Sequence, residues 1–195
     1  MRSNGVIGAT FFLNSLPSGT SSRRDNIVGL LRYVKVDHAE AHAKKGEGLV
    51  ESRKWDEARG EFWKARDDFL ALEMKDRASS MLSEEALCDF ALGEMDRAAA
   101  ALRRSNEIKV QIGDQEGEAT NLLAFGDVLL AQGKDDEAIS SYKSALILFR
   151  RCDVIDGEVQ SHRGLARAFR SMRKQEEAES EEEAAESARL RLART

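Results

Sequence analysis

The chain has 195 residues, 42% of them apolar, with 30 Lys and Arg against 35 Asp and Glu and a net charge of −5. This length suits one domain with a short appendage. Its longest apolar runs are far below the roughly 20 residues that cross a bilayer, and its acidic charge argues against nucleic acid or an anionic membrane as the main partner. Two cysteines cannot form a disulfide framework.

The first 24 residues differ in composition from the rest. They contain no acidic residue, the only proline (Pro17) and many hydroxyl side chains. Residues 1–38 hold five basic and two acidic residues, a sum of +3, so residues 39–195 sum to −8. Residues 1–24 have the composition of either an organelle transit peptide or a disordered tail. We expect a cytoplasmic protein, with organelle targeting as the alternative.

A short amphipathic helix is predicted over residues 25–37. Ile27, Leu30, Leu31 and Val34 follow the i, i+3, i+4, i+7 spacing of one helix face. This helix is expected to cap the first repeat, which follows it in the chain. The surface that it would cover contains four aromatic residues: Trp55, Phe62, Trp63 and Phe69. Internal packing of these rings is favoured, and a docking patch is the alternative if the cap is missing.

The remaining chain repeats with a period of 40. The clearest column is Ala58, Ala98, Ala138 and Ala178. An acidic residue lies two positions before each alanine, and a small residue twelve before it: Gly46, Ala86, Gly126 and Ala166. The position four after each alanine holds Phe62, Leu102, Tyr142 and, atypically, Glu182. This period predicts four repeats, at about residues 39–76, 77–115, 116–154 and 155–195 of a domain spanning 38–195.

Each repeat divides into two helical halves at a short break, and Gly93 and Gly133 are predicted helix stops. The small residues permit two helices to approach, and the large residue fills the space beside them. One hairpin cannot bury its apolar face alone, so stacked hairpins are predicted, an all-α array. The last helix, from Gln175 to about Ala193, is rich in Glu and is predicted to be its polar end.

The pattern of small residue, alanine, large residue and small residue resembles the tetratricopeptide repeat. The clearest copy runs from Leu122 to Ala145, and the resemblance covers about residues 39–190. A period of 40 is similar to the long-helix variety of that family. The resemblance implies a right-handed superhelix of four repeats plus the N-terminal capping helix. It also implies that the first helix of each repeat lines a concave groove, which binds an extended peptide or a helix of a partner protein.

Carried onto this chain, the resemblance assigns eight residues to the groove: Leu87, Phe90, Leu123, Asp127, Leu130, Arg163, Arg167 and Arg170. The three arginines are spaced i, i+4 and i+7, which places them on one helix face. They either hold an acidic segment of the partner or pair with Glu176, Glu179 or Glu183 on the next helix. Both alternatives stay open.

No catalytic, metal or cofactor site is predicted. His38 and His42 have the i, i+4 spacing of paired metal ligands, but no third ligand lies nearby in the sequence, so surface or packing roles are favoured. The sequence therefore indicates a non-catalytic protein–protein interaction module, a scaffold or adaptor. The alternative is a structural protein that self-associates into a homo-oligomer through its aromatic N-terminal end, and an enzyme is disfavoured.

Overall fold

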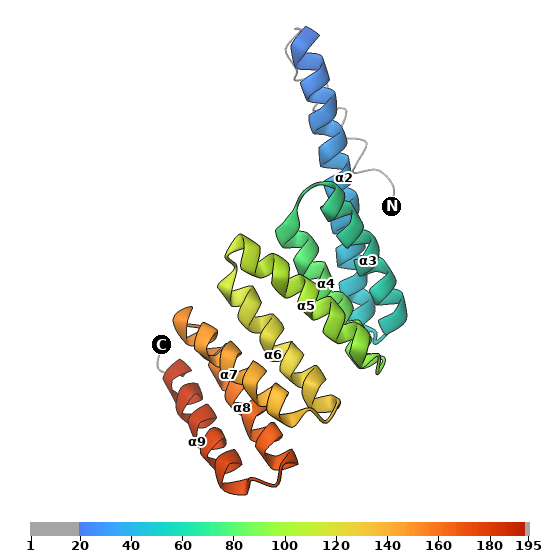
Figure 1. Cartoon of the computed structure of the whole chain (residues 1–195). Coiled ribbons are helices and arrows are strands. Elements are labelled where there is room, and N and C mark those ends of the chain that lie inside the picture. The colour runs from blue at the N-terminus through green and yellow to red at the C-terminus, as the bar shows by residue number, and fades with distance from the viewer. Residues whose placement is uncertain (1–19, 194–195) are drawn as a thin grey trace.

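A computed structural model describes residues 20–193, which form eight helices joined by short turns (Figure 1). The helices are α2 (Thr20–Glu51), α3 (Trp55–Ala71), α4 (Lys75–Ala91), α5 (Met95–Ile112), α6 (Gln115–Ala131), α7 (Asp135–Arg151), α8 (Ile155–Ser171) and α9 (Gln175–Leu192). Residues 20–193 contain no strand. Consecutive helices pair into four hairpins that stack side by side, so the predicted all-α repeat array is confirmed.

The turns between helices place one residue in the left-handed backbone region. Gly93 and Gly133 do so with φ of 80° and 72°, and they follow the ends of α4 and α6 as predicted. Glycine adopts this conformation without steric cost. Arg53 and Arg173 occupy equivalent turns with φ of 56° and 60°, where a side chain makes the conformation less favourable. The two terminal hairpins therefore have more strained turns than the two central ones.

The packing of small against large residues is confirmed at the crossings of the first and third hairpins. A Cβ atom added to Gly46 would lie 2.5 Å from the ring of Phe62, and one added to Gly126 would lie 2.5 Å from the ring of Tyr142. Both rings are fully buried. Tyr142 also contacts Gly164 of α8, where an added Cβ would lie 2.6 Å away. One tyrosine thus fills the space among α6, α7 and α8.

A buried polar network joins the second and third repeats. The Ser83 hydroxyl donates to Asn121 Oδ1 at 2.8 Å, and Asn121 Nδ2 donates to the Ser105 hydroxyl at 2.8 Å. Ser105 in turn donates to the carbonyl of Ser79 at 2.7 Å. Because buried polar groups are costly when unpaired, this chain of hydrogen bonds fixes how α4, α5 and α6 sit together.

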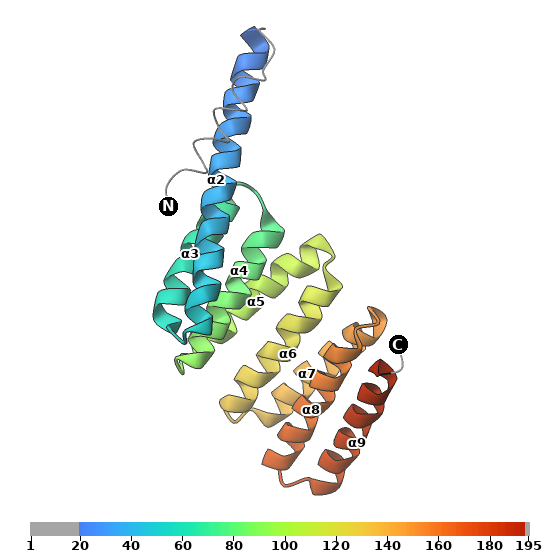
Figure 2. The same cartoon turned by 180° about the vertical axis from the view of Figure 1, so that it is seen from behind.

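The N-terminal cap differs from the prediction. Residues 25–37 are the N-terminal part of α2, a continuous helix of 32 residues, so the expected boundary at residue 38 falls inside a helix. At 1.5 Å per residue, α2 is about 48 Å long and α3 about 26 Å, so α2 extends well beyond its partner (Figures 1 and 2). Leu31 and Val34, expected to cover repeat one, are exposed. The side chain of Ile27 and the whole of residues 1–19 lie outside the described residues.

At the other end, α9 has the polar surface that the sequence predicts. Only Ala178, Ala185 and Ala188 of this helix are buried, and its seven glutamates lie toward its N-terminal end. Acidic side chains there and Arg189 and Arg191 in the last turn suit the helix dipole. The acidic residues predicted for the other second helices also fall in their first turns, but the residues that cap α3, α5, α7 and α9 form no side-chain capping bond.

Candidate functional site

The eight predicted groove residues lie on α4, α6 and α8, the first helices of repeats two to four. Four are exposed: Leu87, Arg163, Arg167 and Arg170. Phe90, Leu123, Asp127 and Leu130 are half-buried, and the three apolar ones among them pack against buried core clusters. The exposed arginines and Leu87 are therefore the side chains most accessible to a partner, and the half-buried residues form the surface beneath them.

One repeat position supplies a row of residues along these first helices. Glu47, Leu87, Asp127 and Arg167 lie 40 residues apart in succession. The structure brings the last two together, because Arg167 Nη2 donates to Asp127 Oδ1 at 2.6 Å. The hydroxyl of Tyr142 donates to the same oxygen at 2.7 Å. Burial raises the pKa of Tyr142 well above its ordinary value, and the bond to Asp127 raises it further, so the phenol stays protonated and anchors Asp127.

The arginines on α8 all point to solvent, and two of them form exposed ion pairs. Arg170 pairs with Glu182 on α9, and Arg167 pairs with Asp127 on α6. The predicted partners Glu176, Glu179 and Glu183 are not used. No ion pair of Arg163 is found within residues 20–193. Exposed pairs contribute about 0–1 kcal/mol, so a partner carboxylate can replace them at small cost.

The structure also shows an apolar cavity that sequence analysis missed. It has a volume of about 550 Å³ and lies between α5 and α6, where Leu102, Val110 and Phe125 line it. Arg103 stacks over Phe125 at 5.1 Å, and the side-chain oxygen of Asn106, another lining residue, is buried without a hydrogen-bond partner. The one signal of this cavity is Val110, an apolar residue that lies half exposed on a second helix. Single exposed valines are common on protein surfaces, so this residue alone does not indicate a cavity.

His42 and His162 each contact a glutamate on the other helix of their hairpin. His42 Nδ1 lies 2.5 Å from Glu61 Oε2, and His162 Nδ1 lies 2.5 Å from Glu181 Oε2. Burial would raise the pKa of Glu61, but hydrogen bonds from His42, Lys64 and Lys45 outweigh it and lower the pKa to about 2. The carboxylate therefore stays ionised and ties α2 to α3.

Comparisons with known proteins agree with this architecture. Residues 76–151 match the tetratricopeptide repeat family. This part of the chain is similar to tetratricopeptide repeats. The matched residues cover α4 to α7, the two central hairpins. No match was found among curated proteins.

Solved structures of low sequence identity share the fold of this chain. BtubC (BKLC) from P. vanneervenii has a TM-score of 0.70 at 13% identity, with 80% of this chain and 64% of that chain covered. Aspartyl phosphate phosphatase F from Bacillus subtilis has a TM-score of 0.77 at 14% identity, with 82% and 42% covered. A Podosopora anserina kinesin light chain variant with nearly identical TPR-like repeats has a TM-score of 0.67 at 14% identity, with 100% and 96% covered.

The chain thus spans about two thirds of the first of these structures and under half of the second. At such identities the likeness concerns the fold. Among the described helices, none has a stretch long and apolar enough to cross a membrane.

Proposed function

We propose that this chain is a non-catalytic protein-interaction module that holds an extended or helical segment of a partner along α4, α6 and α8. The observation that carries this proposal is the row of side chains repeated every 40 residues on the first helices: the exposed Leu87, the half-buried Asp127 and the exposed Arg167. A repeat array presents such a row at regular spacing, which suits a partner segment with its own regular spacing.

The chemistry of the row changes along the array. Leu87 and the half-buried Phe90, Leu123 and Leu130 supply apolar contact, whereas α8 supplies Arg163, Arg167 and Arg170. A guanidinium binds a carboxylate through two parallel hydrogen bonds. The preferred partner segment is therefore apolar in its middle and acidic at the end that lies on α8.

This proposal is tested by a charge reversal with a matched control. The groove variant is Arg163→Glu, Arg167→Glu, Arg170→Glu. The control is Lys143→Glu, Arg151→Glu, Arg189→Glu, which changes the charge equally on the second helices α7 and α9. Partners captured from native extract by the wild type are identified by mass spectrometry, and the acidic segment common to them is made as a synthetic peptide. Its affinity is then measured for all three proteins.

We expect the groove variant to lose the peptide and the control to keep it, with circular dichroism showing that both are folded. Equal affinity of the peptide for all three proteins would show that the three arginines do not contact it. The apolar cavity between α5 and α6 would then be the next surface to test, by Val110→Glu.

The alternative function is self-association through the N-terminal end, and one observation favours it. Val28, Leu31, Tyr33 and Val34 are all more than half exposed on the projecting part of α2. On the neighbouring α3, Phe62 and Phe69 are buried as predicted, whereas Trp63 is 51% exposed. Apolar side chains on successive turns of an uncovered helix form an interaction surface.

Sedimentation velocity over a hundredfold range of concentration separates the two functions. Self-association predicts a mass that rises with concentration in the wild type and stays monomeric in Leu31→Glu, Val34→Glu. The control Val110→Glu, Ile147→Glu changes two similarly exposed apolar residues on second helices and should behave as the wild type. A wild type that stays monomeric throughout would exclude this alternative.

A further inference from the structure

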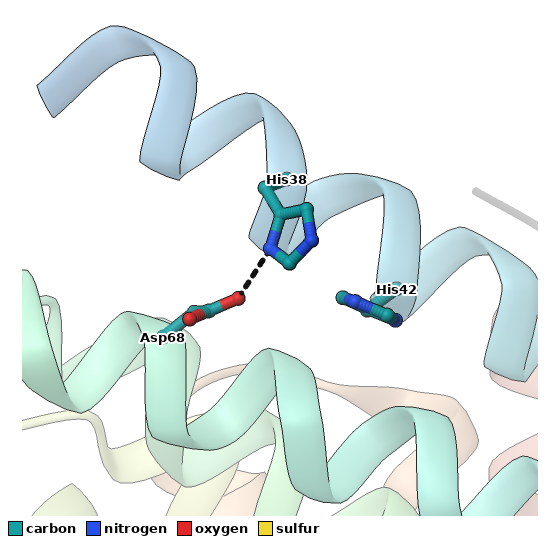
Figure 3. A group of neighbouring side chains, drawn as sticks. All are labelled: His38, His42 and Asp68. Atoms are coloured by element: carbon teal, nitrogen blue, oxygen red, sulfur yellow. Dashed lines mark hydrogen bonds and ion pairs between the residues drawn. The ribbon is translucent and has the colours of Figure 1, made fainter. Parts of the chain in front are cut away.

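Three metal-ligand side chains face one another across the first hairpin (Figure 3). His38 and His42 lie one turn apart on α2, with ring centroids 4.5 Å apart, and Asp68 approaches from α3. His38 Nδ1 is 2.8 Å from Asp68 Oδ2, and one ligand atom from each of the three residues lies within 4.8 Å of the others. The third ligand that the sequence lacks near the two histidines is thus supplied from 26 residues beyond His42.

The Nε2 atom of His42 is available to bind a metal ion, because the contact with Glu61 uses Nδ1. Its Nδ1 is held by Glu61, a buried carboxylate that also accepts from Lys45 at 3.1 Å and Lys64 at 3.0 Å. A carboxylate bonded to one imidazole nitrogen makes that nitrogen the donor and leaves the lone pair on Nε2. This is the arrangement that orients metal-binding histidines in proteins.

The fourth repeat provides an internal comparison, because it carries the same pair 120 residues, or three periods, later. His162 and Glu181 are equivalent to His42 and Glu61 and make the same 2.5 Å contact. There, however, Arg150 donates to His162 Nε2 at 3.1 Å, so both nitrogens are used. The histidine–carboxylate pair therefore has only a packing role where an arginine occupies the Nε2 atom of the histidine.

The other two positions of the cluster also differ in the fourth repeat. Glu158 stands where the first repeat has His38, and it is bonded by Arg150 and by Arg191. Ala188 stands where the first repeat has Asp68. Arg150 of α7, in the third hairpin, and Arg191 of α9 thus occupy this place. Three periods earlier the sequence has Leu30, which lies within α2 itself, and Ala71, and neither brings a charge to the site.

We propose that His38, His42 and Asp68 bind one divalent transition-metal ion of the Zn²⁺ type, with water completing the coordination. Two imidazoles and one carboxylate favour zinc, copper or nickel over magnesium and calcium, which prefer all-oxygen sites. Tetrahedral zinc bonds of about 2.0–2.2 Å place the ligand atoms about 3.3–3.6 Å apart. The hydrogen bond between His38 and Asp68 must therefore open slightly, and more distant ligand atoms must close by up to about an ångström. His38, 64% exposed, is free to rotate.

Such an ion would join α2 to α3 near the point where α2 leaves the array. His38 lies closer than His42 to the projecting part of α2, and Asp68 lies near the end of α3. Because the ion would bind the folded hairpin and not the separated helices, it would stabilise this hairpin as its concentration rises. The inference is independent of partner binding along α4, α6 and α8.

The test is calorimetric titration of the full chain with Zn²⁺, using protein made without an oligohistidine tag. We expect one ion per chain and a raised melting temperature. His38→Ala, which changes an exposed side chain, and Asp68→Asn should lose this binding while staying folded by circular dichroism. Glu61→Gln should weaken it by about 10–100-fold, the effect of losing an orienting partner.

Asp67→Asn is the matched control, because Asp67 is the neighbouring acid on α3 and pairs with Arg66 instead. This variant should bind Zn²⁺ as the wild type does, and Mg²⁺ should give no heat with any of the proteins. Absence of one-to-one binding by the wild type would overturn the proposal. Binding that persists unchanged in both His38→Ala and Asp68→Asn would overturn it equally.

Discussion

The first and last hairpins share a histidine–glutamate pair at equivalent positions, and different neighbours complete it. Arg150 of the preceding helix α7 uses the second nitrogen of His162 in the last hairpin, whereas in the first hairpin His42 lies next to His38 and Asp68. The repeat therefore determines where the pair lies, and the residues around it determine its chemistry. A repeat position cannot be assigned one role in all copies.

The first and last hairpins also differ in their outer surfaces. The outer surface of α9 is mostly charged, whereas α2 extends beyond α3 with exposed apolar side chains. A terminal repeat needs a polar outer face for solubility. Leu190 and Leu192 are exposed on α9, but the exposed apolar group on α2 is larger, which makes the N-terminal end the candidate for self-association.

The largest expected effect concerns the large residue of the hairpin crossing, which is Phe62 in the first hairpin and Glu182 in the last. Phe62 is fully buried, so Phe62→Ala should lower the free energy of unfolding by about 3–5 kcal/mol. Glu182→Ala removes only an exposed ion pair and should cost about 0–1 kcal/mol. Urea unfolding measures both, and similar losses would contradict the assignment of equivalent positions.

A smaller effect is expected at the small residue of the same crossing. Gly46→Ala places a Cβ against the ring of Phe62 and should destabilise the fold by about 1–3 kcal/mol, because a packed core resists extra volume. Gly48→Ala, two residues along the same helix, meets nothing within 4 Å and should instead stabilise the helix by about 0.5–1 kcal/mol. Thermal melts of the two variants should shift in opposite directions, and a shared direction would refute the close crossing.

The smallest effect is a pH dependence confined to the first half of the array. Burial raises the pKa of Glu85 from 4.5 to about 7, although Arg66 opposes this. Two repeats later, Leu146 stands at the position of Arg66 and Leu165 stands at the position of Glu85, and neither leucine titrates. A raised carboxyl pKa favours the folded state below pH 4.5, and this contribution is lost as the pH rises through 7.

After allowance for screening by water, this loss should be on the order of 1 kcal/mol between pH 5 and pH 8. Glu85→Gln keeps the shape and removes the titration, so its unfolding free energy should vary less over this range than that of the wild type. Parallel pH profiles for the two proteins would show that Glu85 titrates normally.

The helix pairs and their crossings are predictable from sequence because each depends on short spacings. The 16-residue separation of Gly46 and Phe62, repeated at Gly126 and Tyr142, identifies the residues that meet. The helix stops at Gly93 and Gly133 are equally local. What the sequence could not show is whether an apolar face is covered. Leu31 and Val34 have the spacing of a buried face, but both are more than half exposed in the structure.

The candidate sites are less predictable because they join residues on different helices. Arg167 meets Asp127 exactly one period away, a contact that the 40-residue repeat permits but does not demand. Arg170 pairs with Glu182 where three neighbouring glutamates were equally available. Asp68 reaches His38 only because of the way α2 and α3 pack against each other. Side-chain choice among several acidic neighbours depends on such details of packing.

Site-specific photo-crosslinking tests the central claim, partner binding along the first helices, most directly. A photoreactive amino acid is placed at Leu87 on α4 or at Val110 on α5, side chains of similar exposure at 47% and 55%. Each protein is mixed with the synthetic acidic peptide identified by capture and then irradiated. Binding along α4, α6 and α8 predicts a peptide adduct from position 87 and none from position 110. An adduct from position 110 alone would contradict the account and place the partner on the second helices.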